Sequence, residues 1–216
     1  MSITNSSPAV SSGVGPRRRY SLAARALFAA MDLLYGKGGS VRKYRVLEIV
    51  ARVPYQAWEN VAYVAITHTS DTPTFAREIH ERVVTVRDQQ DNEQWHLLIL
   101  EEMLHSTGHQ RTLVRDRLLP QLIAFTYYQV SWLLYVLHPG WSHRLNADFE
   151  DHAEHEYFSW AEDNPELETT PWESVFADDY GHHATVADLF RSIGADERRH
   201  KLESEAQMAV PRFGDR

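Results

Sequence analysis

Two Glu-x-x-His pairs, about half the chain apart, constrain the possible fold more than any other feature of this 216-residue sequence. A helix turns by about 100° per residue, so two residues three apart point the same way and can reach one ion. Two other apolar segments each offer a single glutamate. In a four-helix bundle, a di-iron carboxylate site takes one glutamate from each of two helices and a Glu/His pair from each of the other two. The candidate metal ligands are Glu48, Glu93, His96, Glu150, Glu197 and His200.

The composition favours one domain built from long helices. Only ten Gly and nine Pro interrupt the chain, and 43% hydrophobic with 24% charged residues is ordinary for a globular protein. We predict an all-α, ferritin-like four-helix bundle with two additional helices and a di-iron site in the bundle core. Residues 1–18, which begin with a Ser-rich and Gly-containing stretch, are predicted to be a disordered tail, and residues 19–216 a single bundle domain.

Composition also excludes several classes of site and partner. The absence of cysteine excludes disulfides, zinc ribbons and iron–sulfur clusters, and leaves oxygen and imidazole as metal ligands. A net charge of −8 argues against nucleic acid as a partner, because nucleic-acid binders carry an excess of Lys and Arg.

Periodicity and breaker residues predict the order of the elements. Pro54 should kink the second helix, and the stretch 164–183 should be a loop with a functional or packing role. The six expected helices cover residues 19–36, 41–67, 74–109, 113–137, 141–163 and 184–208.

The fourth expected helix is nearly apolar all round. It carries no charged residue from 119 to 137 and is rich in Trp and Tyr. Such a helix is either buried on every side or in contact with lipid or a second subunit. The basic run Arg17 to Arg19 could meet anionic headgroups or simply be solvated. A transmembrane span and secretion are not expected, because the chain has neither eighteen uninterrupted apolar residues nor the order of a signal peptide.

Helical faces separate ligands from other ionisable residues. Glu102 and His105 repeat the metal-type spacing nine residues after Glu93, which places them on the opposite face, and we predict them at the surface. In the run around Glu150, Asp151 and His152 should point elsewhere. Tyr157, seven residues after Glu150, should share its face, as a redox-active phenol would require. The alternative is a core tyrosine with a satisfied hydroxyl.

Several short sequence segments resemble those of the alternative oxidases, a family that includes the plastid terminal oxidases. Members of this family are membrane-associated, non-haem di-iron quinol oxidases that reduce oxygen to water. The resemblance covers most of residues 20–205. Its pieces are Leu47-Glu48 with Val50-Ala51-Arg52-Val53-Pro54, Asn92-Glu93 with His96-Leu97, His143-Arg144, Glu150 with Ala153, His155 and Tyr157, Asp179-Tyr180, and Ala195-Asp196-Glu197 with His200.

The resemblance implies two irons per subunit held by the six ligands, Tyr157 as the redox-active tyrosine, and quinol (ubiquinol or plastoquinol) and oxygen as substrates. It also implies a homodimer associated with one leaflet of a membrane, which would be the cytoplasmic face of the inner membrane in a bacterium. Residues expected to support the metal site are Asn92, His143, Asp196 and Tyr180, and residues expected to bind the substrate are Lys43, Leu47 and Ala153.

The departures from the family pattern spare the metal ligands, and one of them, Lys43, lies near the expected quinol site. The run of three glutamates becomes Glu150-Asp151-His152, an expected small hydroxylic residue is Glu156, and Lys43 stands for an arginine. Two other interpretations therefore stay open. One is a di-iron oxygenase or oxidase acting on another small metabolite, and the other is a non-enzymatic, ferritin-like iron-binding bundle.

Overall fold

The structure is a computed structural model that describes residues 14–69 and 71–210. Within these residues it contains helices and no β-strand, apart from one isolated bridge between Pro171 and Thr185. The elements are α1 (Leu22–Tyr35), α2 (Val41–Ala51), α3 (Val53–Thr67), α4 (Pro73–Ser106), η1 (Val114–Leu118), α5 (Leu119–Leu137), α6 (Pro139–Asp163), η2 (Pro165–Glu168), α7 (Ala177–Tyr180) and α8 (Val186–Ala209).

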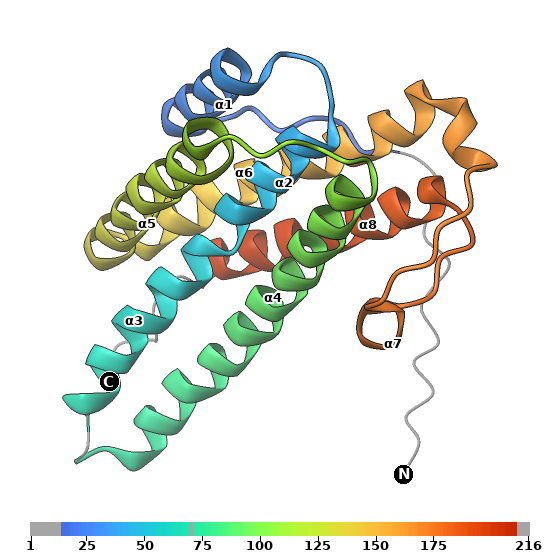
Figure 1. The fold of residues 1–216 in the computed structure, drawn as a ribbon. Helices are drawn as coiled ribbons and strands as arrows, with labels where there is room; N and C mark the ends of the chain where they lie inside the picture. Colours follow the sequence, from blue (N-terminus) through green and yellow to red (C-terminus); the bar gives the residue numbers. More distant parts are fainter. Residues whose placement is uncertain (1–13, 70, 211–216) are drawn as a thin grey trace, which may run out of the picture.

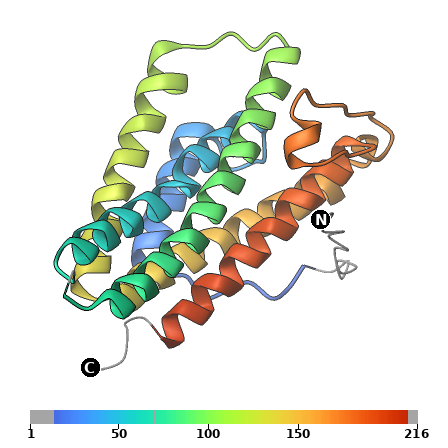
Figure 2. The ribbon, with the colours of Figure 1, turned by 90° about the horizontal axis from the view of Figure 1, so that it is seen from below.

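Four helices, α2, α4, α6 and α8, form the bundle around the candidate ligands. Helices α6 and α8 pack along each other, α2 packs against α4 and α6, and α1 and α5 lie on one side of the bundle (Figures 1 and 2). Helix α2 is the central element, since every residue from Lys43 to Ala51 is buried. The prediction of an all-α, ferritin-like bundle is confirmed; α1 and α5 are the two additional helices, and the structure adds α3, which is split from α2, and the short α7.

The predicted helix 41–67 is divided in two rather than merely kinked. Helix α2 ends before Arg52, and α3 continues from Val53 with Pro54 in its first turn. Proline has no backbone N–H to donate to the preceding turn, which explains the break at this point. The helix starts have similarly local causes. Ser40 accepts a hydrogen bond from the backbone N–H of Lys43 at 3.2 Å and so caps α2.

A π-helical turn, η1, precedes α5 inside the region predicted as one regular helix. Its Asp116 is buried and accepts hydrogen bonds from Arg42 Nε at 2.7 Å and Nη2 at 2.9 Å, which fastens the turn to α2. Asp116 also accepts from the backbone N–H of Thr112 at 2.7 Å. These donors lower the pKa of Asp116 although its burial raises it.

The loop between α6 and α8 is fastened to the bundle by Glu102. Its carboxylate accepts hydrogen bonds from Ser174 Oγ at 2.5 Å and from the backbone N–H of Val175 at 3.0 Å. His105 is exposed, as predicted, whereas Glu102 is half-buried. The loop it holds contains α7 and therefore Tyr180.

The segment before α1 is bonded to buried carboxylates of α6. The backbone N–H of Ser21 donates to Asp148 at 2.7 Å, and that of Arg18 donates to Asp151 at 3.0 Å. Residues 1–13 of the predicted tail 1–18 lie outside the described residues. The last part of this segment contacts the bundle through Arg18. Asp151 also accepts from Lys201 Nζ at 3.1 Å, while His152 stacks on Phe28, so both point away from the candidate ligands.

Candidate metal centre

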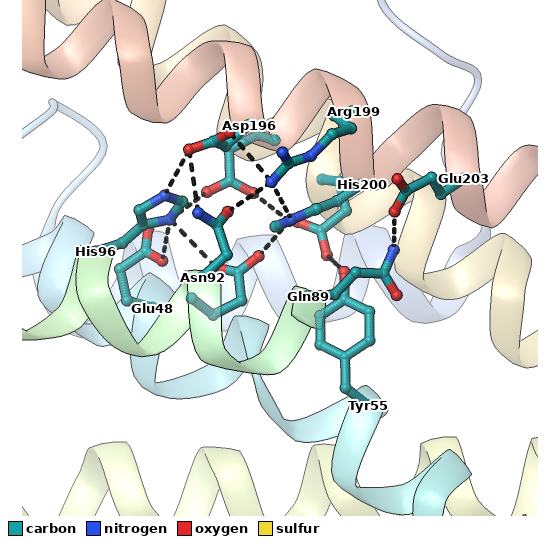
Figure 3. Close-up of polar contacts among 12 residues, drawn as sticks. Glu48, Tyr55, Gln89, Asn92, His96, Asp196, Arg199, His200 and Glu203 are labelled. Atoms are coloured by element: carbon teal, nitrogen blue, oxygen red, sulfur yellow. Dashed lines mark hydrogen bonds and ion pairs between the residues drawn. The ribbon is translucent and has the colours of Figure 1, made fainter. Parts of the chain in front are cut away.

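The six predicted ligands meet in the core of the bundle. Helices α2 and α6 each supply one glutamate, and α4 and α8 each supply a Glu/His pair. All six side chains have no exposed surface. In Figure 3, Glu48 and His96 lie at one end of the cluster, and His200 lies at the other. The ligands are Glu48 of α2, Glu93 and His96 of α4, Glu150 of α6, and Glu197 and His200 of α8.

The ligand atoms form two overlapping groups, each within 4.8 Å. Glu93 and Glu197 belong to both groups. The first group adds Glu48 and His96, and the second adds Glu150 and His200. Two carboxylates shared between two groups are what a pair of neighbouring ions with bridging carboxylates requires. The arrangement therefore provides two adjacent metal positions.

The histidine nitrogens point into the carboxylates. His96 Nδ1 lies 3.4 Å from Glu48 Oε2, 3.5 Å from Glu93 Oε2 and 3.2 Å from Glu197 Oε1. One ring nitrogen can donate at most one hydrogen, so it cannot satisfy three oxygens. His200 Nδ1 lies 2.6 Å from Glu93 Oε1 in the second group. A cation among these atoms would satisfy all of them together.

Every ligand has at least one buried polar atom without a hydrogen-bond partner. Leaving such atoms buried and unpaired is costly, and buried charges are normally paired or bound to metal. Oxygen-rich ligation with two imidazoles suits iron or manganese, so the donor set fits a di-iron centre. The atoms are Glu48 Oε2, Glu93 Oε1 and Oε2, His96 Nδ1, Glu150 Oε2, Glu197 Oε1 and Oε2, and His200 Nδ1.

Burial and mutual repulsion shift the protonation of the carboxylates. Burial raises the pKa of Glu48 to about 8 and that of Glu150 to about 7. Burial also raises the pKa of Glu197 well above its usual value, and the charge of Glu93 adds to this effect. Glu93 is the exception, because the neighbouring His200 outweighs burial and lowers its pKa. Without a metal ion, the cluster thus retains protons near neutral pH.

Asp196 holds the far side of the His96 ring. Its Oδ2 atom lies 3.3 Å from His96 Nε2 and accepts hydrogen bonds from Asn92 Nδ2 at 3.2 Å and Tyr180 Oη at 2.9 Å. A carboxylate on Nε2 keeps the proton there and leaves the Nδ1 lone pair for a metal. The structure thus brings three of the four predicted supporting residues together behind one ligand.

His143, the fourth predicted supporting residue, lies further from the ligands. Its ring packs against Trp58 at 4.4 Å between centroids, and Trp58 in turn packs edge-on against Tyr55. Both ring nitrogens of His143 lack a hydrogen-bond partner. Burial lowers its pKa to about 3, so the ring is neutral at physiological pH.

Two tyrosines contact the ligands. The hydroxyl of Tyr157 donates to Glu48 Oε1, so this residue lies at the site as its spacing predicted. The hydroxyl of Tyr55 donates to Glu150 Oε1 at 2.8 Å, and this contact was not predicted. A signal was present, because Tyr55 follows Glu48 by seven residues, the spacing that singled out Tyr157 after Glu150.

The three predicted substrate-binding residues are almost completely buried. Leu47 and Ala153 have no exposed surface and belong to the apolar core around the site. Lys43 is 1% exposed, and its Nζ donates to Asp32 at 2.8 Å and lies 3.6 Å from Glu156. The structure therefore places an internal ion pair where the family resemblance places an arginine.

Comparison with known proteins adds to this geometry. A family model described as Alternative oxidase matches residues 21–208. A relative from Arabidopsis thaliana, named Ubiquinol oxidase 4, chloroplastic/chromoplastic, is 32% identical over 127 residues, which cover 59% of this chain. The match spans 33% of the relative's own length.

Removing a shared or an unshared ligand should change metal binding differently. We expect Glu93→Ala to abolish binding at both positions and Glu48→Ala to leave about one ion per chain, because Glu93 belongs to both groups and Glu48 to one. Elemental analysis after anaerobic loading with Fe²⁺ measures the stoichiometry. Glu162→Ala, at an exposed glutamate of α6, is the matched control and should keep two ions. Equal losses from Glu48→Ala and Glu93→Ala would contradict the shared role.

The raised pKa values of Glu48 and Glu150 predict a pH-dependent stability. Unfolded glutamate ionises near 4.5, so above that pH and up to about 8 the folded chain binds more protons, and stability falls as pH rises. We expect the melting temperature of the metal-free protein to fall by at least about 2–4 °C from about pH 6.5 to about pH 8, the shift that about 1 kcal/mol produces.

Added Mn²⁺ should restore more stability at the higher pH, because fewer protons then compete with the metal. Glu48→Gln, which cannot ionise, should reduce the pH dependence. His143, whose folded pKa is lowered to about 3, opposes this trend only near pH 6.5, where the unfolded imidazole loses its proton. A melting temperature that is constant across the window would contradict the interpretation.

Proposed function

This chain belongs to the alternative oxidase family, and we propose that it is a quinol:oxygen oxidoreductase that reduces oxygen to water at a centre of two irons. The observation that supports this most is the buried cluster of four carboxylates and two imidazoles, in which Glu93 and Glu197 are shared between two metal positions. In the balanced reaction, two quinols lose four electrons and four protons to one oxygen molecule, and two quinones and two water molecules result.

The proposed roles of the residues follow from their contacts. Glu48 and His96 would hold one iron, Glu150 and His200 the other, and the two shared glutamates both. Bound irons would supply the binding of oxygen and its reduction by several electrons. Asp196 would keep the proton of His96 on Nε2, which leaves Nδ1 available as a ligand.

Tyr157 is the proposed donor of one electron and one proton. Its side chain is fully buried, and its hydroxyl donates to the ligand Glu48. Burial and the surrounding carboxylates raise its pKa well above 10, so the phenol keeps its proton. The proton and the electron are therefore held together at one side chain beside a metal position.

An apolar face formed by α1 and α5 supports association with one leaflet of a membrane. Over the described residues, no helix is both long enough and apolar enough to cross a bilayer. Between α1 and α5 lies an apolar hollow of about 390 Å³, lined by Leu27, Leu122 and Tyr127 among others. A patch of this kind marks an interaction site. The large exposed apolar side chains of α1 and α5 are Leu22, Leu33, Leu122, Phe125, Val130, Leu133, Val136 and Leu137, and Leu118 of η1 and Trp141 of α6 flank α5 in the sequence.

The proposed route of the quinol runs from this face toward the metal centre. Tyr127, on the inner wall of the hollow, packs against Phe149 with 5.7 Å between the ring centroids, and Phe149 precedes the ligand Glu150. Arg19, Arg25 and Arg144 line a neighbouring hollow at the edge of the face, where they could meet anionic headgroups. A homodimer belongs to the same proposal and rests on family membership alone.

Oxygen uptake with a quinol tests the proposed reaction. We expect the iron-loaded protein in liposomes to consume oxygen only when a short-chain quinol is present, with cyanide added to exclude haem oxidases. Tyr157→Phe should keep two irons and lose about 10²-fold or more of the uptake, since it lacks the transferable proton. Tyr63→Phe, at an exposed tyrosine of α3, is the control.

Two irons without quinol-dependent uptake would favour a di-iron enzyme acting on another metabolite. Many irons per chain in a cage would favour iron storage. Full uptake by Tyr157→Phe would remove its redox role.

Charge on the apolar face should weaken membrane binding. Leu122→Glu combined with Phe125→Glu should lower the partition onto liposomes by about tenfold or more, because two apolar side chains lose their burial in lipid. Co-sedimentation measures the bound fraction. Leu202→Glu on α8 is the matched control, because Leu202 is 55% exposed and Leu122 is 60% exposed. Equal loss from the control would contradict the assignment of the face.

A further inference from the structure

Two tyrosines contact the metal cluster in a reciprocal way. Tyr55 follows Glu48 by seven residues, and Tyr157 follows Glu150 by seven residues. Each tyrosine donates its hydroxyl to the other glutamate, so that Tyr55 bonds Glu150 and Tyr157 bonds Glu48. These glutamates are the two that the metal positions do not share. Each metal position therefore has one unshared carboxylate, and one tyrosine donates a hydrogen bond to that carboxylate.

Each tyrosine occupies one oxygen of its glutamate and leaves the other free. In Glu150, Oε1 accepts from Tyr55 at 2.8 Å, while Oε2 has no hydrogen-bond partner. In Glu48, Oε1 accepts from Tyr157, while Oε2 has no hydrogen-bond partner and lies 3.4 Å from His96 Nδ1. The tyrosines thus determine which oxygen of each carboxylate is available to a metal.

The hydroxyl of Tyr55 is itself held in place. Asn146 Nδ2 donates to it at 3.1 Å and also donates to Ser204 Oγ at 3.0 Å, and all three side chains are buried. The ring packs edge-on against Trp58 and, at 6.0 Å between centroids, against the ligand His200. Figure 3 shows Tyr55 reaching the His200 end of the cluster from α3. The hydroxyl accepts one hydrogen bond and donates one, which fixes its direction.

We propose that Tyr55 is the positioning residue of the second metal position, where it holds Oε1 of Glu150 so that Oε2 binds the iron shared with His200. This inference rests on the proposed di-iron centre and goes beyond it by assigning one supporting tyrosine to each iron. Partners of metal ligands fix ligand orientation, and their loss typically lowers metal affinity by about 10–100-fold.

Tyr55 and Tyr157 differ in what surrounds their hydroxyls. Tyr157 packs among the rings of Tyr44 and Phe190. Tyr55 receives the additional hydrogen bond from Asn146. That bond anchors the Tyr55 hydroxyl to α6 four residues before Glu150, so one helix holds both the tyrosine and the carboxylate that it orients.

Mössbauer spectroscopy of protein loaded with ⁵⁷Fe²⁺ tests the assignment without measuring activity. The wild type should show two iron signals of equal area. Tyr55→Phe should change the quadrupole splitting of one signal and weaken binding of one iron by about 10–100-fold. Tyr157→Phe should change the other signal. Tyr44→Phe, at a buried tyrosine that donates to the carbonyl of Glu156, should change neither.

The outcomes separate the inference from the proposed function. A wild type that binds no pair of irons would remove the di-iron centre itself. A wild type with two signals that Tyr55→Phe leaves unchanged would overturn the role of Tyr55 alone. If Tyr55→Phe does not fold, Asn146→Ala keeps the phenol and removes its anchor. It should then change the same signal, and an unchanged spectrum from it would equally overturn the proposal.

Discussion

The repulsion among four buried carboxylates is the interaction on which the rest of the structure depends. Glu48, Glu93, Glu150 and Glu197 come from four helices and have no exposed surface. Two histidines offset only part of their charge, which leaves the other carboxyls protonated or bound to cations. The pairing of α6 with α8 and the burial of α2 hold the four groups together against this repulsion.

The same constraint explains why so many polar contacts lie behind the cluster. Asp196 fixes the His96 ring, and Tyr55 and Tyr157 each occupy one carboxylate oxygen. Each partner narrows the orientations that a ligand can adopt before a metal arrives. A cluster that is oriented in this way loses little conformational entropy on binding an ion. The smaller entropic cost gives a higher affinity for the ion.

Much of the bundle and the ligand set was predictable, because both depend on local spacing. A helix places Glu93 with His96, and Glu197 with His200, whatever surrounds them. Contacts set by tertiary structure were not predictable. The π-helical turn fastened by Asp116 and the hold of Glu102 on the loop both depend on neighbours distant in sequence. Tyr55 was predictable only in part. Its seven-residue spacing from Glu48 can be read from the sequence, but its partner Glu150 lies on another helix.

The bonded segment before α1 has a consequence for the order in which the chain folds. Arg18 donates to Glu205 across 187 positions and to Asp151 across 133 positions. Contacts at such separations form late, because the entropy of closing so long a loop must first be offset by the elements between. Growing from the ribosome, the chain can complete this junction only after α8 has emerged. The N-terminal segment therefore docks as one of the last events, on a bundle that is already assembled.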